Sequence, residues 1–154
     1  MRSCRAFVVR TALIVPLVVL IATTTRSAGA DPTNVFITCF CSDAVGGNLC
    51  MALRQKVGAL ASYRLVDQPL GAGIGVHLVC RDTGLEIKGS QSAVSVAYTV
   101  YVDSANEVFV ASAVMLVGTQ RLASTADDIL STAGRIAEDN ASILHSRESG
   151  SSHH

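Results

Sequence analysis

The sequence lacks tryptophan, has three prolines and carries few charged side chains, and each scarcity narrows the kind of protein that it can encode. Aromatic residues make up 5% and charged residues 16% of its 154 residues, whereas hydrophobic residues make up 49%. A disordered chain shows the opposite balance. Basic residues are neither in excess nor clustered, which argues against a nucleic-acid partner. The composition is that of a globular protein.

Motifs of the common hydrolases and metal enzymes are also missing. The sequence has no G-x-S-x-G elbow, no H-E-x-x-H helix and no C-x-x-C pair. The alternating glycines of residues 71–75 are followed by neither a helix nor a lysine, as a phosphate-binding loop would be. His77 is isolated on a segment typical of a strand, where we expect a structural role. No catalytic residue and no cofactor is predicted.

The N-terminal apolar run, residues 11–22, is shorter than the stretch of about 20 residues that a membrane-spanning helix needs. It follows three arginines and precedes Ala28-Gly29-Ala30, in the order that is typical of a secretory signal peptide. We therefore predict that residues 1–30 are removed after Ala30, leaving a periplasmic or secreted protein with no stable membrane anchor. An uncleaved N-terminal anchor is the alternative. The remaining chain keeps all 12 acidic residues and is mildly acidic.

Hydrophobic periodicity predicts a β-α-β-β-β-α order in the rest of the chain. The expected strands are residues 35–41, 63–67, 76–81, 93–102 and 107–117, and helices are expected after residues 43 and 125. Because a right-handed β-α-β crossover places its helix on one face of a sheet, both helices can cover the same face. The prediction is an α/β (α+β) fold, a two-layer sandwich with a mixed five-stranded sheet and two helices on one face. Residues 31–144 would form one domain, and residues 145–154 a disordered tail.

Three local features support these boundaries. Ser42 or Asp43 is expected to cap the first helix. The glycine pair Gly46-Gly47 would loosen that helix, and we expect it to serve close packing against a neighbour. At the second helix, Ser124 with Asp127, or Thr125 with Asp128, is similar to a capping box.

The hairpin of residues 93–117 is where we expect a working surface. Its first strand alternates valine and tyrosine with small or polar residues, so the smaller set would line the face that the helices leave open. An open face or an exposed edge strand can dock a partner. We name Tyr101, Phe109 and Met115 as candidates for contact with another envelope protein, of unknown identity.

Four cysteines follow the N-terminal segment, and in an oxidising compartment the default expectation is two disulfides. Cys39 and Cys41 lie two apart on a strand and point to the same face, at a spacing that is at the limit for a mutual bond. Of the two remaining pairings we favour Cys41–Cys50 with Cys39–Cys80, which would clamp the strand-to-helix turn. The other is Cys39–Cys50 with Cys41–Cys80.

A thiol-redox or soft-metal site is the alternative to structural disulfides. Cys39, Cys41 and Cys50, with His77 or Cys80, offer ligands that suit Cu(I) or Zn. The spacing is not that of a zinc finger.

The run VFITCFCSDAVGGNLCMALRQKVGALASYRLVD resembles the opening of small secreted proteins of Gram-negative bacteria. Its architecture, with a second strand that ends in Val66-Asp67, is also similar to the N-terminal domain of the translocation protein TolB and to outer-membrane activators of peptidoglycan synthases. The resemblance implies a non-enzymatic envelope protein that acts through protein contacts. The chain departs from those families in its cysteines and in lacking a propeller or a lipid anchor.

Overall fold

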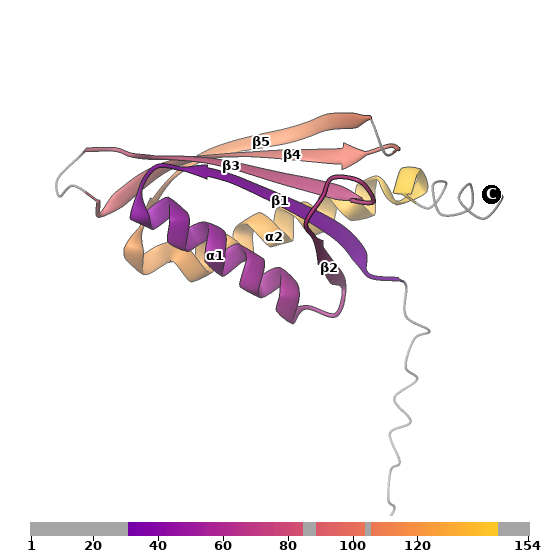
Figure 1. The fold of residues 1–154 in the computed structure, drawn as a ribbon, viewed down its shortest axis with the longest axis horizontal. Helices are drawn as coiled ribbons and strands as arrows, with labels where there is room; N and C mark the ends of the chain where they lie inside the picture. The colour runs from indigo at the N-terminus through magenta and orange to yellow at the C-terminus, as the bar shows by residue number, and fades with distance from the viewer. Residues whose placement is uncertain (1–30, 85–88, 104–105, 145–154) are drawn as a thin grey trace, which may run out of the picture.

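A computed structural model describes residues 31–84, 89–103 and 106–144 (Figure 1). Its elements are β1 (Thr33–Cys41), α1 (Ala44–Ala59), β2 (Tyr63–Val66), β3 (Ile74–Asp82), β4 (Gln91–Tyr101), β5 (Glu107–Gly118), a short 3-10 helix η1 (Thr119–Arg121) and α2 (Leu122–Asp139). The predicted order is confirmed, with η1 as an addition. The predicted signal peptide and C-terminal tail lie outside the described residues, and their boundaries stay predictions.

The five strands form one mixed sheet in the order β2-β1-β3-β4-β5. β1 runs parallel to β2 and to β3, whereas β4 is antiparallel to β3 and β5. Figure 1 shows α1 and α2 on the same side of this sheet, so the predicted two-layer sandwich is confirmed. The opposite side, which we call the open face, carries no helix among the described residues.

The core lies between the sheet and the two helices, and it follows from strand alternation. Every second residue of the central strands faces the helices, and those side chains are almost fully buried. Burying one aliphatic side chain of this size stabilises the fold by about 1.5–3 kcal/mol. The core members from the strands are Val35, Ile37, Ile74, Val76, Leu78, Cys80, Val94, Val96, Tyr98, Val100 and Val117.

Helix α1 begins as the sequence predicts. The side chain of Asp43 accepts a hydrogen bond from the Gly46 backbone N–H at 2.8 Å, which is a helix N-cap. Gly46 itself packs tightly, because a Cβ there would contact the side chains of Cys80 and Cys41. Gly47 has open space around it. The expectation of close packing is therefore confirmed for Gly46 alone.

Helix α2 begins differently from the prediction, and the predicted capping box is wrong. The helix starts at Leu122, directly after η1, and its cap residue Arg121 makes no side-chain capping bond. Thr125 is instead buried inside the helix. The 3-10 turn continues the chain from β5 straight into α2, so the helix is already formed where the Ser/Thr-Asp pattern occurs.

Among the described residues, neither α1 nor α2 combines the length and the apolar character that a membrane-spanning helix needs.

Candidate functional site: the open face of the sheet

The open face is formed by the strand residues that alternate with the core set. The β1–β3, β3–β4 and β4–β5 registers bring these side chains into rows that run across the sheet. Apolar rows alternate with polar ones along the strands. The face consists of Phe36, Thr38, Phe40, His77, Val79, Arg81, Ala93, Ser95, Ala97, Thr99, Phe109, Ser112, Val114 and Leu116.

Five large apolar side chains of this face are exposed to solvent. The exposed fractions are 73% for Phe40, 46% for Val79, 61% for Phe109, 79% for Val114 and 59% for Leu116. Phe40 lies beside Val79 across β1 and β3, and Val79 is separated from Val114 only by a serine on β4. Contiguous exposed apolar side chains on a monomer mark interaction sites more often than isolated ones do.

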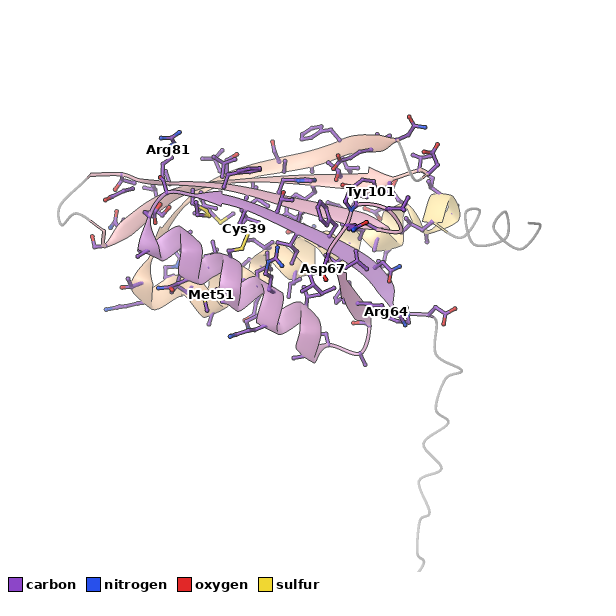
Figure 2. The ribbon with its side chains drawn as sticks, viewed as in Figure 1. Cys39, Met51, Arg64, Asp67, Arg81 and Tyr101 are labelled. Carbon is purple, nitrogen blue, oxygen red and sulfur yellow. A yellow bond between two sulfur atoms is a disulfide. The ribbon has the colours of Figure 1, made fainter. Side chains whose placement is uncertain are left out.

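Formal charge is scarce on the open face. Arg81 lies at one end of the sheet, and Figure 2 shows it pointing away from the helices. Glu107, the first residue of β5, lies at the other end and is held by a polar cluster. Between Arg81 and Glu107 the face therefore carries no acidic residue, lysine or arginine, and its apolar side chains alternate with small polar ones.

The polar cluster is centred on the imidazole of His77. The hydroxyl Oγ1 of Thr38 lies 2.7 Å from Nδ1 of His77, and Oε1 of Glu107 lies 2.6 Å from its Nε2. In the tautomer that satisfies both contacts, His77 accepts from Thr38 and donates to Glu107. The ring also makes an edge contact with Phe36, with centroids 6.3 Å apart. His77 thus joins β1 to β5 across the width of the sheet.

Two more hydroxyl groups converge on Glu107. Thr99 donates to its Oε1 at 2.6 Å and Tyr101 at 2.9 Å. Burial alone would raise the pKa of Glu107, but the hydrogen bonds from Thr99 and Tyr101, together with the nearby His77, hold that pKa below its ordinary value. Burial, and then the hydrogen bond to Glu107 and its charge, raise the pKa of Tyr101 to about 12.

Gly75 provides the space for this cluster. A Cβ at residue 75 would collide with the Thr99 hydroxyl and would lie 2.7 Å from Nε2 of His77 and 3.2 Å from Oε1 of Glu107. The glycine is therefore a packing requirement of the cluster. Its backbone conformation is that of an ordinary strand residue, because its φ is not among the positive values.

The cluster has the order hydroxyl, imidazole, carboxylate that nucleophilic enzymes use. Such enzymes also need a cleft and N–H donors that stabilise an oxyanion. In the described residues the cluster stands on a strand surface whose neighbouring backbone groups are paired in the sheet. The hydrogen bonds instead tie β1, β3, β4 and β5 together, so we interpret the cluster as a rigid polar part of the open face.

Sequence reasoning treated His77 as isolated and missed this convergence. The hairpin register pairs Tyr101 with Glu107, and Thr99 lies two residues from Tyr101 on the same face. Alternation along the strands together with the hairpin loop could have placed these three side chains together. The contribution of Thr38 depends on the parallel pairing of β1 with β3.

The three predicted contact residues lie in different places. Phe109 lies on the open face and is exposed. Tyr101 is 4% exposed and is held in the polar cluster by its hydroxyl group. Met115 pairs with Val94 and packs against the core, so its predicted position on the open face is wrong. The strand alternates normally from Ala111 onward, which puts the odd-numbered residues there on the helix side.

The four cysteines form two disulfides, Cys39–Cys50 and Cys41–Cys80. The predicted formation of disulfides is confirmed, but the favoured pairing is wrong. Helix α1 runs back over β1, so Cys50, more than one turn into it, lies above Cys39 instead of Cys41. Cys41 is directly opposite Cys80 in the parallel register, with Cα atoms 4.3 Å apart. Two disulfides indicate an oxidising compartment.

The residues of the soft-metal alternative are divided between the two sides of the sheet, and their sulfur atoms are already bonded. The sulfur atoms of Cys39, Cys41 and Cys50 are all bonded in disulfides on the helix side of the sheet. His77 belongs to the open face. Among the residues described, no group of three or more His, Cys, Asp or Glu side chains is placed to hold a metal ion.

Comparison with known proteins gives only weak likenesses to solved structures, and two of these are described here. No protein-family model and no curated protein matches the chain. A hypothetical protein of Chlamydia trachomatis is 10% identical over 55% of this chain and 71% of its own, with a TM-score of 0.36. An uncharacterised lipoprotein B of Nitrosomonas europaea is 15% identical over 73% of this chain and 79% of its own, with a TM-score of 0.26. Neither supports the predicted resemblance to TolB.

Proposed function

We propose that the protein is an exported, non-enzymatic binding domain that docks onto another envelope protein through the open face of its sheet. The observation that supports this function is the group of five exposed apolar side chains, Phe40, Val79, Phe109, Val114 and Leu116, on a face that no helix covers in the described chain. Helices bury the other face, so exposure here is not a general looseness of the fold.

The chemistry of the face defines the partner. Its exposed apolar side chains alternate with small polar ones, and Arg81 and Glu107 lie near opposite ends. A flat, largely apolar and uncharged protein surface would bury these side chains without leaving a charge unpaired, whereas a charged partner would find little to pair with. The polar cluster around His77 would supply the hydrogen bonds that fix the orientation of a partner.

The two disulfides are consistent with a place outside the cytoplasm. Together with the predicted signal peptide they support a periplasmic or secreted protein.

Photo-crosslinking in the secreting organism tests the docking face. A photoreactive residue replaces Phe40 or Val79 on the open face, or Met51, which is 58% exposed on the outer side of α1 (Figure 2). We expect one specific adduct from positions 40 and 79 and none from position 51. The captured protein is then purified, and its affinity is measured for the parent chain, for Phe40→Glu and for the matched control Met51→Glu.

We expect Phe40→Glu to weaken binding by about tenfold or more, since a buried unpaired carboxylate replaces an apolar contact. Met51→Glu should bind as the parent does. Equal adducts from all three positions, no adduct from any, or an affinity that Phe40→Glu leaves unchanged would each contradict docking through the open face.

A further inference from the structure

The outer edge of β5 is a long strand edge that pairs with no other strand in the described part of the chain. β5 has 12 residues, whereas β2, at the opposite edge of the sheet, has four and includes the exposed Arg64. Proteins protect exposed edges by keeping them short, by placing charges or prolines on them, or by covering them. β2 follows that rule, whereas β5 is long and carries its one charged residue, Glu107, at its first position.

The backbone hydrogen bonds show which groups β5 presents at its edge. Tyr101 N–H donates to the Gly73 carbonyl at 3.1 Å, and the Gln91 carbonyl accepts from Thr83 N–H at 3.3 Å. Odd-numbered residues of β4 therefore direct their backbone groups toward β3, and even-numbered ones toward β5. Their partners on β5 include Ala111, Ala113 and Met115.

The residues between those partners point their backbone groups outward. They are Ser112, Val114 and Leu116, and each presents an N–H and a carbonyl along the free edge. The irregularity in the β4–β5 register lies before this segment, between Tyr98 and Thr99, so residues 111–118 form a regular edge. No charged residue and no proline occurs from Val108 to Gly118.

We propose that β5 pairs with β5 of a second copy of this chain, antiparallel about a two-fold axis at Val114, so that the two sheets join into one ten-stranded sheet. A second copy fits this edge because an uncharged strand meets no repulsion from itself. In this register Val114 lies opposite Val114, and Ser112 lies opposite Leu116 of the second copy. All three carry outward backbone groups, as antiparallel pairing requires.

The charges that flank the edge favour the same arrangement. Glu107 and Arg121 are the nearest charged residues on either side, and they lie equally far along the chain from Val114. An antiparallel pair centred on Val114 brings the end of β5 that carries Glu107 toward the end of the second copy's β5 that leads into Arg121. A parallel pair would instead align like charges. The open faces of the two copies would then form one continuous surface. The dimer is proposed independently of the docking of that surface to an envelope partner.

Disulfide trapping and sedimentation test this dimer on the chain secreted by an expression host. Two residues opposite each other at a two-fold axis have Cα atoms about 5.5 Å apart, within disulfide range. We expect Val114→Cys to give a covalent dimer on a non-reducing gel. Val79→Cys, exposed on the same face but on β3, is the matched control and should stay a monomer on that gel.

Ser112→Pro removes an outward N–H and leaves the bonds to β4 intact, as edge prolines do. In sedimentation equilibrium we expect the parent chain and Ser112→Ala to form dimers. The dimer of Ser112→Pro should have a dissociation constant about tenfold higher or more, because each of the two copies loses one hydrogen bond to the other. Phe40→Glu should leave this dimer unchanged, which separates it from open-face docking.

A parent chain that stays monomeric at high concentration would overturn the proposal. So would an absent Val114→Cys cross-link, or equal cross-linking of Val79→Cys. If Ser112→Pro does not fold, the cross-linking result alone decides.

Discussion

Gly75 shows how a single absent side chain shapes the open face. We predict that Gly75→Ala destabilises the fold by about 1–3 kcal/mol, because the added methyl group must displace Thr99, His77 or Glu107 from a close-packed cluster. Urea denaturation measures the change in the free energy of unfolding. Gly47→Ala is the matched control: a Cβ there has open space inside a helix, so it should stabilise by up to about 1 kcal/mol. Equal effects of the two substitutions would contradict this account.

Glu107 makes the stability of the protein depend on pH. The folded state lowers its pKa below the ordinary 4.5, so the ionised carboxylate stabilises the fold above that pH. This contribution is lost as the pH falls from about 4.5 through the lower pKa of the folded state. We expect the stability difference between the parent and Glu107→Gln, measured in urea, to shrink across that range. The exposed Asp139→Asn is the control, and the same loss there would show that the effect is general.

Tyr101 makes the stability of the protein depend on pH in the alkaline range, where its contribution is lost as the pH rises. Because its pKa is raised from 10.0 to about 12, its neutral form stabilises the fold fully below pH 10. The contribution is lost as the pH rises through the folded value. Unfolding of Tyr101→Phe followed between those two pH values should show a weaker pH dependence than unfolding of the parent. An unchanged dependence would mean that the folded state does not raise the pKa of Tyr101.

At the scale of elements, the two disulfides tie α1 and β3 to β1. Paired substitutions distinguish the two possible pairings by counting thiols. Cys39→Ala with Cys50→Ala should leave no free thiol, since Cys41 and Cys80 remain bonded to each other. Cys41→Ala with Cys50→Ala should leave two free thiols. The opposite result in a thiol titration of the denatured proteins would restore the pairing favoured from sequence.

The same variants should also differ in stability. The Cys41–Cys80 bond closes a loop of 39 residues in sequence separation and the Cys39–Cys50 bond one of 11. In the chain-entropy account the longer loop contributes about 1 kcal/mol more to the free energy of unfolding. Loss of Cys41 and Cys80 should therefore cost more than loss of Cys39 and Cys50.

The elements also show what the sequence could and could not predict. The alternation of buried and open-face residues along β4 depends on local periodicity, and it was predicted correctly. The start of α2 was predicted wrongly, because the chain passes directly from β5 through η1 into the helix. The disulfide pairing depended on the direction in which α1 returns over β1. The polar cluster depended on registers between strands that are distant in sequence.

At the scale of the whole molecule, one face of the sheet stabilises the fold and the other is available for binding. One face holds the core against α1 and α2, and the other presents its apolar side chains to solvent. This division predicts that the two faces respond differently to substitution. Leu78→Ala, in the core, should lower the free energy of unfolding by about 2–5 kcal/mol, because it removes a fully buried side chain and leaves a cavity.

Val114→Thr, on the open face, should change the free energy of unfolding by less than about 0.5 kcal/mol, because an exposed strand position accepts another β-branched residue. Its affinity for an open-face partner should nevertheless fall, since the exchanged methyl group belongs to the apolar surface. Urea denaturation and titration with the captured partner measure the two quantities on the same protein. A large loss of stability from Val114→Thr would mean that this face is part of the core, and that its exposed apolar side chains serve the fold before they serve a partner.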